Sequence, residues 1–289
     1  MSIFTNIREL VCAQLGLGGR MKLRRYRTMA GKANVYETIY DDGNPVRVMN
    51  VKGTYQSATY LDDDCYELVF GYHRAYNALF QAGMPVHSIA MLGGGGFSYP
   101  KYLISHYPDI AVDVVEIDPM VVAIAERWFY VDRLAAEFDL DETGRLGVFV
   151  QDAREFLEEP GRSYDAIIND CFAARVPVMS LATVEAARAI HARLNAGGMY
   201  LTNVISALRG PHAKLLHSVM LTLQQEFAHV HVVPGSEFLP RLVDNYVVIA
   251  TDGSYRFDHE IDVQPDPETA VLVDEFIEEY EDEFFLLDT

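Results

Sequence analysis

The stretch from His87 to Asp118, HSIAMLGGGGFSYPKYLISHYPDIAVDVVEID, decides the fold of this chain. It opens with a short apolar run, Ser88 to Leu92, which is typical of a buried strand, and four glycines follow at once. Glycine lets a backbone turn tightly and come within contact distance of a ligand. A helix is expected from Ser98, and the free N–H groups at its start favour an anionic or polar ligand. A second apolar run, Val112 to Ile117, predicts the next strand.

Glu116 lies on this second predicted strand, about 20 residues after the glycines, where nucleotide-binding βαβ units place the carboxylate that accepts ribose hydroxyls. The alternative is a plain connection within a sheet, with Glu116 solvated at a strand end. Four successive glycines cost backbone entropy, and a plain connection needs only one or two. The order of strand, glycines, helix, strand and acid therefore favours a nucleotide site.

Length and composition describe a globular chain of 289 residues, half of them hydrophobic, which suffices for one or two domains. No apolar run reaches the ~18 residues that span a bilayer, and the charged N-terminus makes a poor secretory signal. Three scattered cysteines favour neither a disulfide framework nor a zinc site. We therefore expect a cytoplasmic protein that does not act at a membrane.

A net charge of −19 argues against a nucleic-acid partner, because phosphates would repel an acidic surface. It favours a cationic partner, or it serves only to keep the protein soluble. The basic island Arg20 to Arg27 could meet an acidic neighbour such as the C-terminal tail, but a solvated edge strand is the preferred interpretation.

The chain divides into three predicted parts. Residues 1–82 hold an N-terminal helix over 1–19, a small antiparallel sheet within Lys32 to Tyr60, and a helix from Cys65 to Ala82. Residues 83–253 alternate strands and helices, which predicts a doubly wound, mostly parallel α/β sheet of seven strands. Residues 254–289 are acidic with interleaved aromatics, which favours an amphipathic helix or docking tail.

Polar residues follow several of the predicted strands, and the carboxyl ends of parallel strands meet at one crevice. We expect this crevice to gather Gly93–Gly96, Glu116, Asp152 and Asp170. Asp152 would accept a hydrogen bond from an adenine amino group, beside an apolar slot formed around Ile117 and Ala153. The sequence has no GxxxxGK(S/T) motif, so an adenine nucleoside is favoured over a triphosphate. A dinucleotide stays open, although GGGG is not GxGxxG.

Asp170 is the acid placed to meet a reacting group. A carboxylate there can orient an amine, help to remove its proton and stabilise developing positive charge. The alternative role is a strand-end cap. The adjacent Cys171 is either a nucleophile or, as we prefer, a small residue of the pocket wall. The pair His229 and His231 has no third ligand nearby in sequence, so no metal site is expected.

Six segments together resemble the spermidine synthase family, the polyamine aminopropyltransferases, within the class I S-adenosylmethionine (AdoMet)-dependent methyltransferase superfamily. MLGGGGFSYPKYL is similar to the family's GGGDGG loop, VVEIDPMVV to its VEID segment, and VQDAREFL to its DA/DG-x-x-FL segment. YDAIINDC resembles the strand with the catalytic aspartate, RLNAGGMYLTNV matches a later strand, and VKGTYQSATYLDDDCYEL is a looser echo of the family's LDG-x-x-Q…DE-x-x-Y region. The resemblance covers residues 35–252.

The resemblance implies roles for single residues. Glu116 and the neighbouring Ile117 and Asp118 would belong to the site of the donor, which is AdoMet or decarboxylated AdoMet. Asp170 would activate the attacking amine of a small-molecule acceptor, next to Cys171. Gln56 and Tyr66 would line the donor and amine pockets. A homodimer without a metal is the family-level expectation.

Two departures from the family pattern concern its acids. Gly96 stands where the family has the aspartate that holds the donor's amine, and Ala173 replaces the second acid of D-x-x-D-P. Each lost charge-assisted bond could cost about 2 kcal/mol in binding. We therefore keep three hypotheses: an aminopropyltransferase, an AdoMet-dependent methyltransferase on an unknown acceptor, and a nucleoside-binding homologue without turnover.

Overall fold

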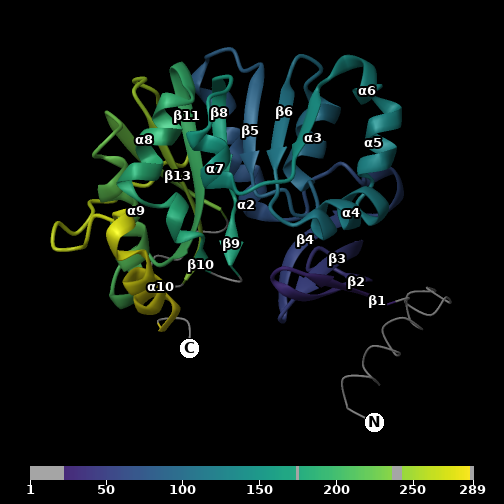
Figure 1. The fold of residues 1–289 in the computed structure, drawn as a ribbon, viewed down its shortest axis with the longest axis horizontal. Coiled ribbons are helices and arrows are strands. Elements are labelled where there is room, and N and C mark those ends of the chain that lie inside the picture. Colours follow the sequence, from purple (N-terminus) through teal and green to yellow (C-terminus); the bar gives the residue numbers. More distant parts are fainter. Residues whose placement is uncertain (1–22, 174–175, 236–242, 287–289) are drawn as a thin grey trace, which may run out of the picture.

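The computed structural model describes residues 23–173, 176–235 and 243–286 (Figure 1). The helix expected over residues 1–19 lies outside this part of the chain. Two separate sheets form the described structure, one of seven strands and one of four, beside a small two-stranded hairpin. Figure 1 shows the four-stranded sheet below the carboxyl ends of the central strands of the larger one.

The larger sheet has the strand order β12-β13-β11-β8-β5-β6-β7. Its four pairs from β11 through β8, β5 and β6 to β7 are parallel, whereas β13 pairs antiparallel with both β11 and β12. This confirms the predicted doubly wound, seven-stranded and mostly parallel sheet. The strand bounds are β5 Ser88–Leu92, β6 Ala111–Val115, β7 Leu146–Phe149, β8 Tyr164–Asn169, β11 Leu194–Ser206, β12 His229–Pro234 and β13 Asp244–Thr251.

Helices cover both faces of this sheet because each central strand is apolar on both sides. In β5, Ala90 and Leu92 pack into one core while Ile89 and Met91 pack into the other, as the two-residue period of a strand requires. The first core lies under α7 Ala153–Glu158, α8 Val184–Ala192 and α9 Lys214–Leu223. The second lies under α3 Ser98–His106, α4 Pro119–Trp128, α5 Val131–Glu137 and α6 Leu140–Thr143.

The smaller sheet is an antiparallel meander of β1 Arg24–Thr28, β2 Gly31–Ile39, β3 Pro45–Val51 and β4 Thr54–Tyr60. This confirms the predicted N-terminal antiparallel sheet and the edge strand at residues 24–27. The guanidinium of Arg24 stacks 3.6 Å from the ring centroid of Trp128, so α4 covers part of the basic island.

The predicted helix from Cys65 to Ala82 is wrong in its first half. A 3₁₀ turn, η1 Asp62–Asp64, is followed by an irregular segment with a turn at residues 65–67, and helix begins only with α2 Gly71–Ala75 and η2 Tyr76–Ala82. The reason is burial in two different cores. Leu68 packs under α3 and α5, whereas Val69 and Phe70 pack against the smaller sheet, and one helix face could not serve both.

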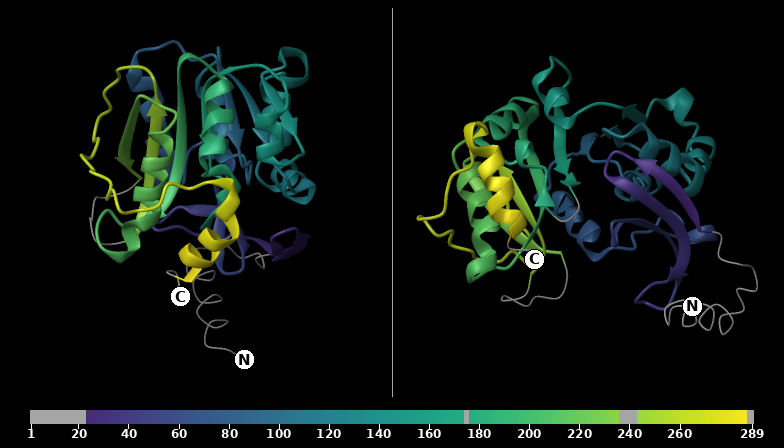
Figure 2. Two further views of the ribbon diagram at one scale, coloured as in Figure 1. Left: turned by 60° about the vertical axis from the view of Figure 1, so that its left-hand side comes forward. Right: turned by 60° about the horizontal axis from the view of Figure 1, so that its bottom comes forward.

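The acidic C-terminal segment forms a helix that packs on the main domain, which agrees with the amphipathic helix, one of the two forms that the sequence favours. It forms η5 Asp274–Phe276 and α10 Ile277–Leu286, and Leu272, Tyr280 and Phe284 are buried in the core under α7, α8 and α9. Figure 2 shows α10, in yellow, on the same side of the sheet as α8 and α9. Its acids Glu278, Glu279 and Glu281 are exposed, whereas its aromatic residues Tyr280 and Phe284 are buried.

Lys101 on α3 ties the two sheets together through a buried ammonium group. Its Nζ donates to Thr59 Oγ1 at 3.0 Å and to the carbonyl oxygen of Cys65 at 2.9 Å, and the residue is only 1% exposed. Burial away from water disfavours the charged form, which lowers the pKa of Lys101 from 10.5 to about 7.

This shift predicts a pH dependence of stability. Between pH 7 and pH 10.5 the unfolded chain binds a proton at Lys101 that the folded protein has lost, so the free energy of unfolding rises with pH. The contribution is up to about 1.4 kcal/mol per pH unit. Denaturant titrations of wild type and Lys101→Met at pH 7.5, 8.5 and 9.5 should diverge in favour of the wild type as pH rises. Parallel pH profiles would contradict the prediction.

Candidate active site

A cavity opens at the carboxyl ends of β5, β6 and β8. It is lined by nearly all of the residues that the sequence predicts for the donor and for catalysis, together with the tip of the β1–β2 hairpin. The predicted residues in its wall are Gln56, Gly93, Gly94, Gly95, Gly96, Glu116, Ile117, Asp118, Asp152, Ala153, Asp170 and Cys171. The fold therefore brings together residues that lie more than 100 positions apart in sequence.

At the glycine loop, the chain that leaves β5 passes very close to the chain that leaves β8. Gly93 has φ +87°, and a Cβ on it would lie 2.8 Å from the carbonyl oxygen of Asp170. Its N–H donates to the carbonyl of Val115 at 2.9 Å, and the N–H of Asp170 donates to that of Leu92 at 2.9 Å. A side chain at position 93 would push Asp170 out of place, which is why glycine is needed here.

Glu116 is buried against this loop and is 9% exposed. Its Oε2 accepts the N–H groups of Gly94 and Gly95, both at 3.1 Å, and its Oε1 accepts the N–H of Asp118 at 3.0 Å. Burial raises the pKa of Glu116, against the opposing effect of these backbone bonds. Three of the about four lone-pair sites of the carboxylate are used in this way, and Oε1 keeps one with which to accept a hydroxyl group of a ligand.

Asp118 joins the cavity to the smaller sheet. Its Oδ1 accepts the N–H of Met120 at 2.8 Å and so caps α4, while its Oδ2 accepts the N–H of Met29. Met29 and its neighbours Thr28 and Ala30 line the cavity. The hairpin tip is thus a wall of the site that sequence reasoning missed, because no local motif marks it.

Asp152 and Ala153 begin α7 at the other end of the cavity. The Oδ1 of Asp152 accepts the N–H groups of Arg154 at 2.7 Å and Glu155 at 3.2 Å, which caps the helix. Within the described residues no hydrogen bond reaches its Oδ2. Ile117 faces the same cavity and is 47% exposed, as expected of an apolar surface left for a ring to cover.

Asp170 follows directly after β8, with its side chain only 12% exposed. Its Oδ2 accepts the hydroxyl of Tyr72 at 3.1 Å and lies 3.3 Å from His73 Nε2. Its Oδ1 accepts the amide of Asn203 at 3.2 Å. The sequence predicted Asp170 but not these three partners, which come from α2 and β11 and share no spacing with it.

Three further polar atoms near Asp170 are buried and lack a hydrogen-bond partner within the part of the chain that the structure describes. They are His73 Nδ1, Tyr76 Oη and Asn203 Oδ1. Burial, and next the charge of Asp170, raise the pKa of Tyr76 well above its usual value, so its phenol stays protonated. Buried polar groups in native proteins are usually paired, so these atoms point to a polar ligand or water beside Asp170.

A second cavity meets the first at Asp170. Gln56, Asp170 and Phe172 line both of them. The second cavity is aromatic, and its walls include Tyr40, Tyr55, Phe70 and Tyr72. Aromatic faces attract cations, and a carboxylate at one end adds charge complementarity. The arrangement can hold two molecules, with Asp170 at the point where they meet.

Tyr66 is not part of either cavity, contrary to the prediction that it lines the amine pocket. Its hydroxyl donates to Glu137 Oε2 at 2.6 Å, and its ring packs edge-on against Phe138. In the irregular segment at residues 65–70, Tyr66 lies against α5 instead of facing the strand ends. Tyr72 is the tyrosine that reaches Asp170.

Cys171 lines the first cavity next to Asp170. Burial raises the pKa of its thiol well above the usual value, and the charges of Glu116, Asp170 and Asp152 add to the effect. A thiol nucleophile needs its thiolate form, which these surroundings disfavour. The geometry agrees with the interpretation of Cys171 as a residue of the pocket wall.

Gly96 is tightly enclosed. Its N–H donates to Ser57 Oγ at 2.6 Å, and a Cβ at this position would lie 2.8 Å from both Ser57 Cβ and Phe129 Cδ1. Real Cβ atoms essentially never come within 3.0 Å of a heavy atom. The packing of the loop therefore leaves no room for an acidic side chain at position 96.

Among the residues that the structure describes, no group of three or more His, Cys, Asp or Glu side chains could hold a metal ion. His231, one of the two histidines considered from sequence, pairs with Glu260 through Nδ1 at 2.7 Å. Within the same described residues, no helix combines the length and the apolar character that a membrane crossing requires.

Comparison with known proteins assigns this site to a family. Residues 81–233 match the model of the spermine/spermidine synthase domain, and this range holds the glycine loop, Glu116, Asp152 and Asp170. The chain belongs to the spermine/spermidine synthase family. The resemblance inferred from the sequence motifs is confirmed.

Relatives agree with the family but overlap only part of the chain. The polyamine aminopropyltransferase of Vibrio vulnificus is 31% identical over 154 residues, 52% of this chain and 48% of that protein. The eEF1A lysine and N-terminal methyltransferase of Danio rerio is 28% identical over 156 residues, 50% of this chain and 21% of that protein. The chain thus spans about half the length of the Vibrio relative.

Solved structures agree in fold. The crystal structure of a probable spermidine synthase from Corynebacterium glutamicum superposes with a TM-score of 0.67 at 23% identity, and the match covers 81% of this chain and 82% of that one. This likeness confirms the fold class, including the small N-terminal sheet beside the larger one.

Proposed function

We propose that this protein transfers an aminopropyl group from decarboxylated AdoMet to an amine acceptor. The observation that carries the proposal is Asp170, which lies where a nucleoside-sized cavity and an aromatic cavity meet. A displacement between two substrates needs such a junction, because the nucleophile and the reactive carbon must be held together and aligned.

The residues of the first cavity suit the donor. Glu116 would accept a ribose hydroxyl, and Asp152 would accept the adenine amino group through Oδ2. Ile117 and Ala153 would cover the faces of the ring. The sulfonium and its aminopropyl chain would then extend past Gly93 toward Asp170, whose carboxylate also favours the positive charge of the donor.

Residues at the junction suit the transfer step. The free amine of the acceptor attacks the methylene carbon next to the sulfonium, and a C–N bond forms. The C–S bond breaks with its electron pair going to sulfur, which leaves neutral methylthioadenosine. Asp170 accepts the proton that the new ammonium group gives up, while Tyr72 and Asn203 hold its carboxylate in place.

Incubation with decarboxylated AdoMet and putrescine is expected to give methylthioadenosine and spermidine in equal amounts. Chromatography of both products measures this directly, and heat-treated protein is the control. If a high concentration of enzyme gives neither product with putrescine or with longer di- and polyamines, aminopropyl transfer is excluded.

A second candidate is methyl transfer from intact AdoMet, and the enclosed Gly96 specifically favours it. The family places an acid here for the donor's amine, and this loop has no room for one. Without that carboxylate, a donor that keeps its own carboxylate meets less repulsion. The Danio rerio relative carries methyltransferase in its name.

Calorimetry with the two sulfonium donors separates the candidates. Aminopropyl transfer predicts tighter binding of decarboxylated AdoMet, whereas methyl transfer predicts tighter binding of intact AdoMet and formation of S-adenosylhomocysteine. A homodimer and a cytoplasmic location remain predictions of the sequence.

A further inference from the structure

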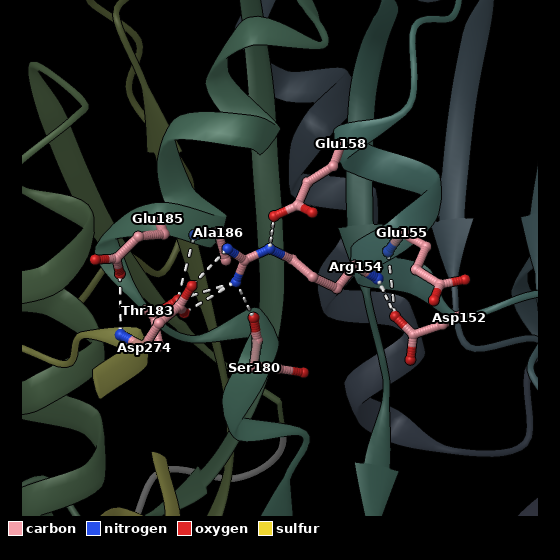
Figure 3. A network of polar contacts seen from close by, with 9 residues as sticks. All are labelled: Asp152, Arg154, Glu155, Glu158, Ser180, Thr183, Glu185, Ala186 and Asp274. Atoms are coloured by element: carbon pink, nitrogen blue, oxygen red, sulfur yellow. Dashed lines mark hydrogen bonds and ion pairs between the residues drawn. The ribbon is translucent and has the colours of Figure 1, made fainter. Parts of the chain in front are cut away.

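Arg154 links two parts of the wall of the donor cavity, one at Asp152 and one at Ser180. Figure 3 shows its polar contacts. Its backbone N–H donates to Asp152, the residue proposed to meet the adenine, while its side chain runs to the part of the wall at Ser180. There Nη1 donates to the carbonyl oxygen of Ser180 at 2.8 Å and to Thr183 Oγ1 at 3.3 Å. Ser180 also lines the cavity. The distance between these two parts of the wall thus depends on where this guanidinium sits.

The C-terminal segment fixes the guanidinium. Asp274, which is 120 positions away in sequence, accepts Nη1 at 3.0 Å on Oδ1 and Nη2 at 2.7 Å on Oδ2. The two parallel bonds form the bidentate pair that holds arginine most rigidly. Thr183 adds a bond from Oγ1 to Asp274 Oδ1 at 2.6 Å. The side chain of Arg154 is 15% exposed and that of Asp274 is 38% exposed, so water screens the pair on the side of the acid.

Asp274 is itself anchored from several sides. Its N–H donates to Glu185 Oε2 at 3.1 Å. Two residues earlier, the N–H of Leu272 donates to Thr222 Oγ1 at 2.9 Å, and the carbonyl of Leu272 accepts the N–H of Val184 at 2.9 Å. Tyr280, on α10, is buried in the same core as α7. The segment is therefore part of the domain that carries the site.

We propose that Asp274 is a positioning residue for the nucleoside, acting through Arg154 to set the spacing between Asp152 and the wall at Ser180. This rests on the proposed function in one respect, that an adenosine compound occupies the first cavity. The acidic C-terminal segment then has a role in substrate binding beyond packing, although none of its residues reaches the cavity wall in the described part of the chain.

Replacing Asp274 with alanine tests the proposal on the full-length protein. The affinity for methylthioadenosine, measured by calorimetry, is expected to fall about tenfold, which corresponds to about 1.4 kcal/mol. The KM of the sulfonium donor should rise while kcat and the KM of the amine stay unchanged. Hydrogen exchange should quicken at the amides of Arg154 and residues 181–184, but not in β5 or β6. Asp274→Asn should give an intermediate effect, because its amide still accepts one bond from arginine.

Glu275→Ala is the matched control, since it removes an exposed acid from the same turn and is expected to bind the nucleoside as the wild type does. Thermal unfolding identifies a variant that fails to fold, in which case Asp274→Asn decides. If the wild type binds methylthioadenosine and Asp274→Ala binds it equally well, the positioning role is overturned and the proposed function is not. Absence of nucleoside binding by the wild type would instead overturn the proposed function and the inference with it.

Discussion

Asp170→Asn is expected to lower kcat for group transfer by roughly 100- to 10,000-fold, the range that a positioned general base contributes. The amide has the shape of the carboxylate; its one oxygen can keep the bond from Asn203, and its NH2 group can donate to the hydroxyl oxygen of Tyr72, so the fold and the donor cavity should persist. It cannot take the proton of the attacking amine or favour the positive charge at the junction. Single-turnover formation of methylthioadenosine measures the loss, with donor affinity measured separately.

Asp165→Asn is the matched control for this experiment, because Asp165 lies on the same strand, β8, at the opposite end. Its carboxylate accepts the N–H groups of His87 at 2.8 Å and Ser88 at 2.9 Å, a structural role far from both cavities. We expect the control to lose stability and to keep its turnover rate. If Asp170→Asn transfers the group as fast as Asp165→Asn does, Asp170 has no catalytic role.

The central fold could be predicted because its signals are local. Within His87 to Asp118 the order of apolar run, glycines, helix and apolar run already contains β5, α3 and β6. The two apolar runs are buried on both faces, which is what a parallel sheet between two layers of helices requires. The rule that parallel strands end at one edge of the sheet then predicts that Glu116, Asp152 and Asp170 lie together, and it needs no tertiary contact.

Residues 65–82 could not be predicted, because their conformation is set by two cores at once. A run such as CYELVFGYHRAYNALF has ordinary helix-forming content, so propensity favours one continuous helix. Leu68 and Phe70 are nevertheless buried in different clusters, which keeps the chain out of a helix until Gly71. Because of this difference, the tyrosine that reaches Asp170 is Tyr72 and not Tyr66.

The partners of the predicted acids were missed for a related reason. Asn203, Met29 at the hairpin tip, and Asp274, which bonds to Arg154, come from elements far apart in the chain. A strand end marks where an acid will lie, but nothing in its neighbourhood marks what will bond to it. Only the packing of β11, the small sheet and the C-terminal segment brings these groups together.

Glu116→Gln is expected to weaken methylthioadenosine binding by roughly 30- to 100-fold, or about 2–3 kcal/mol, since the charge-assisted bond to the ribose would be lost. In the wild type Oε2 already accepts the N–H groups of Gly94 and Gly95. The amide nitrogen of a glutamine cannot accept a bond, so it would face either the N–H groups of Gly94 and Gly95 or that of Asp118, and one backbone anchor is lost as well. Calorimetry at pH 7.5 measures the loss, and Glu126→Gln, an exposed acid on α4, is the control.

The pH dependence of binding separates the charge of Glu116 from its shape. Burial raises the pKa of this carboxyl, so the wild type is expected to lose affinity as pH falls through a value above the usual 4.5. The ligand binds the ionised form, and a protonated acid presents one donor where the ribose hydroxyl needs an acceptor. Glu116→Gln has no such group and should show a flat profile in this range. A wild-type profile as flat as that of the variant would mean that the ribose is not held by the Glu116 carboxylate.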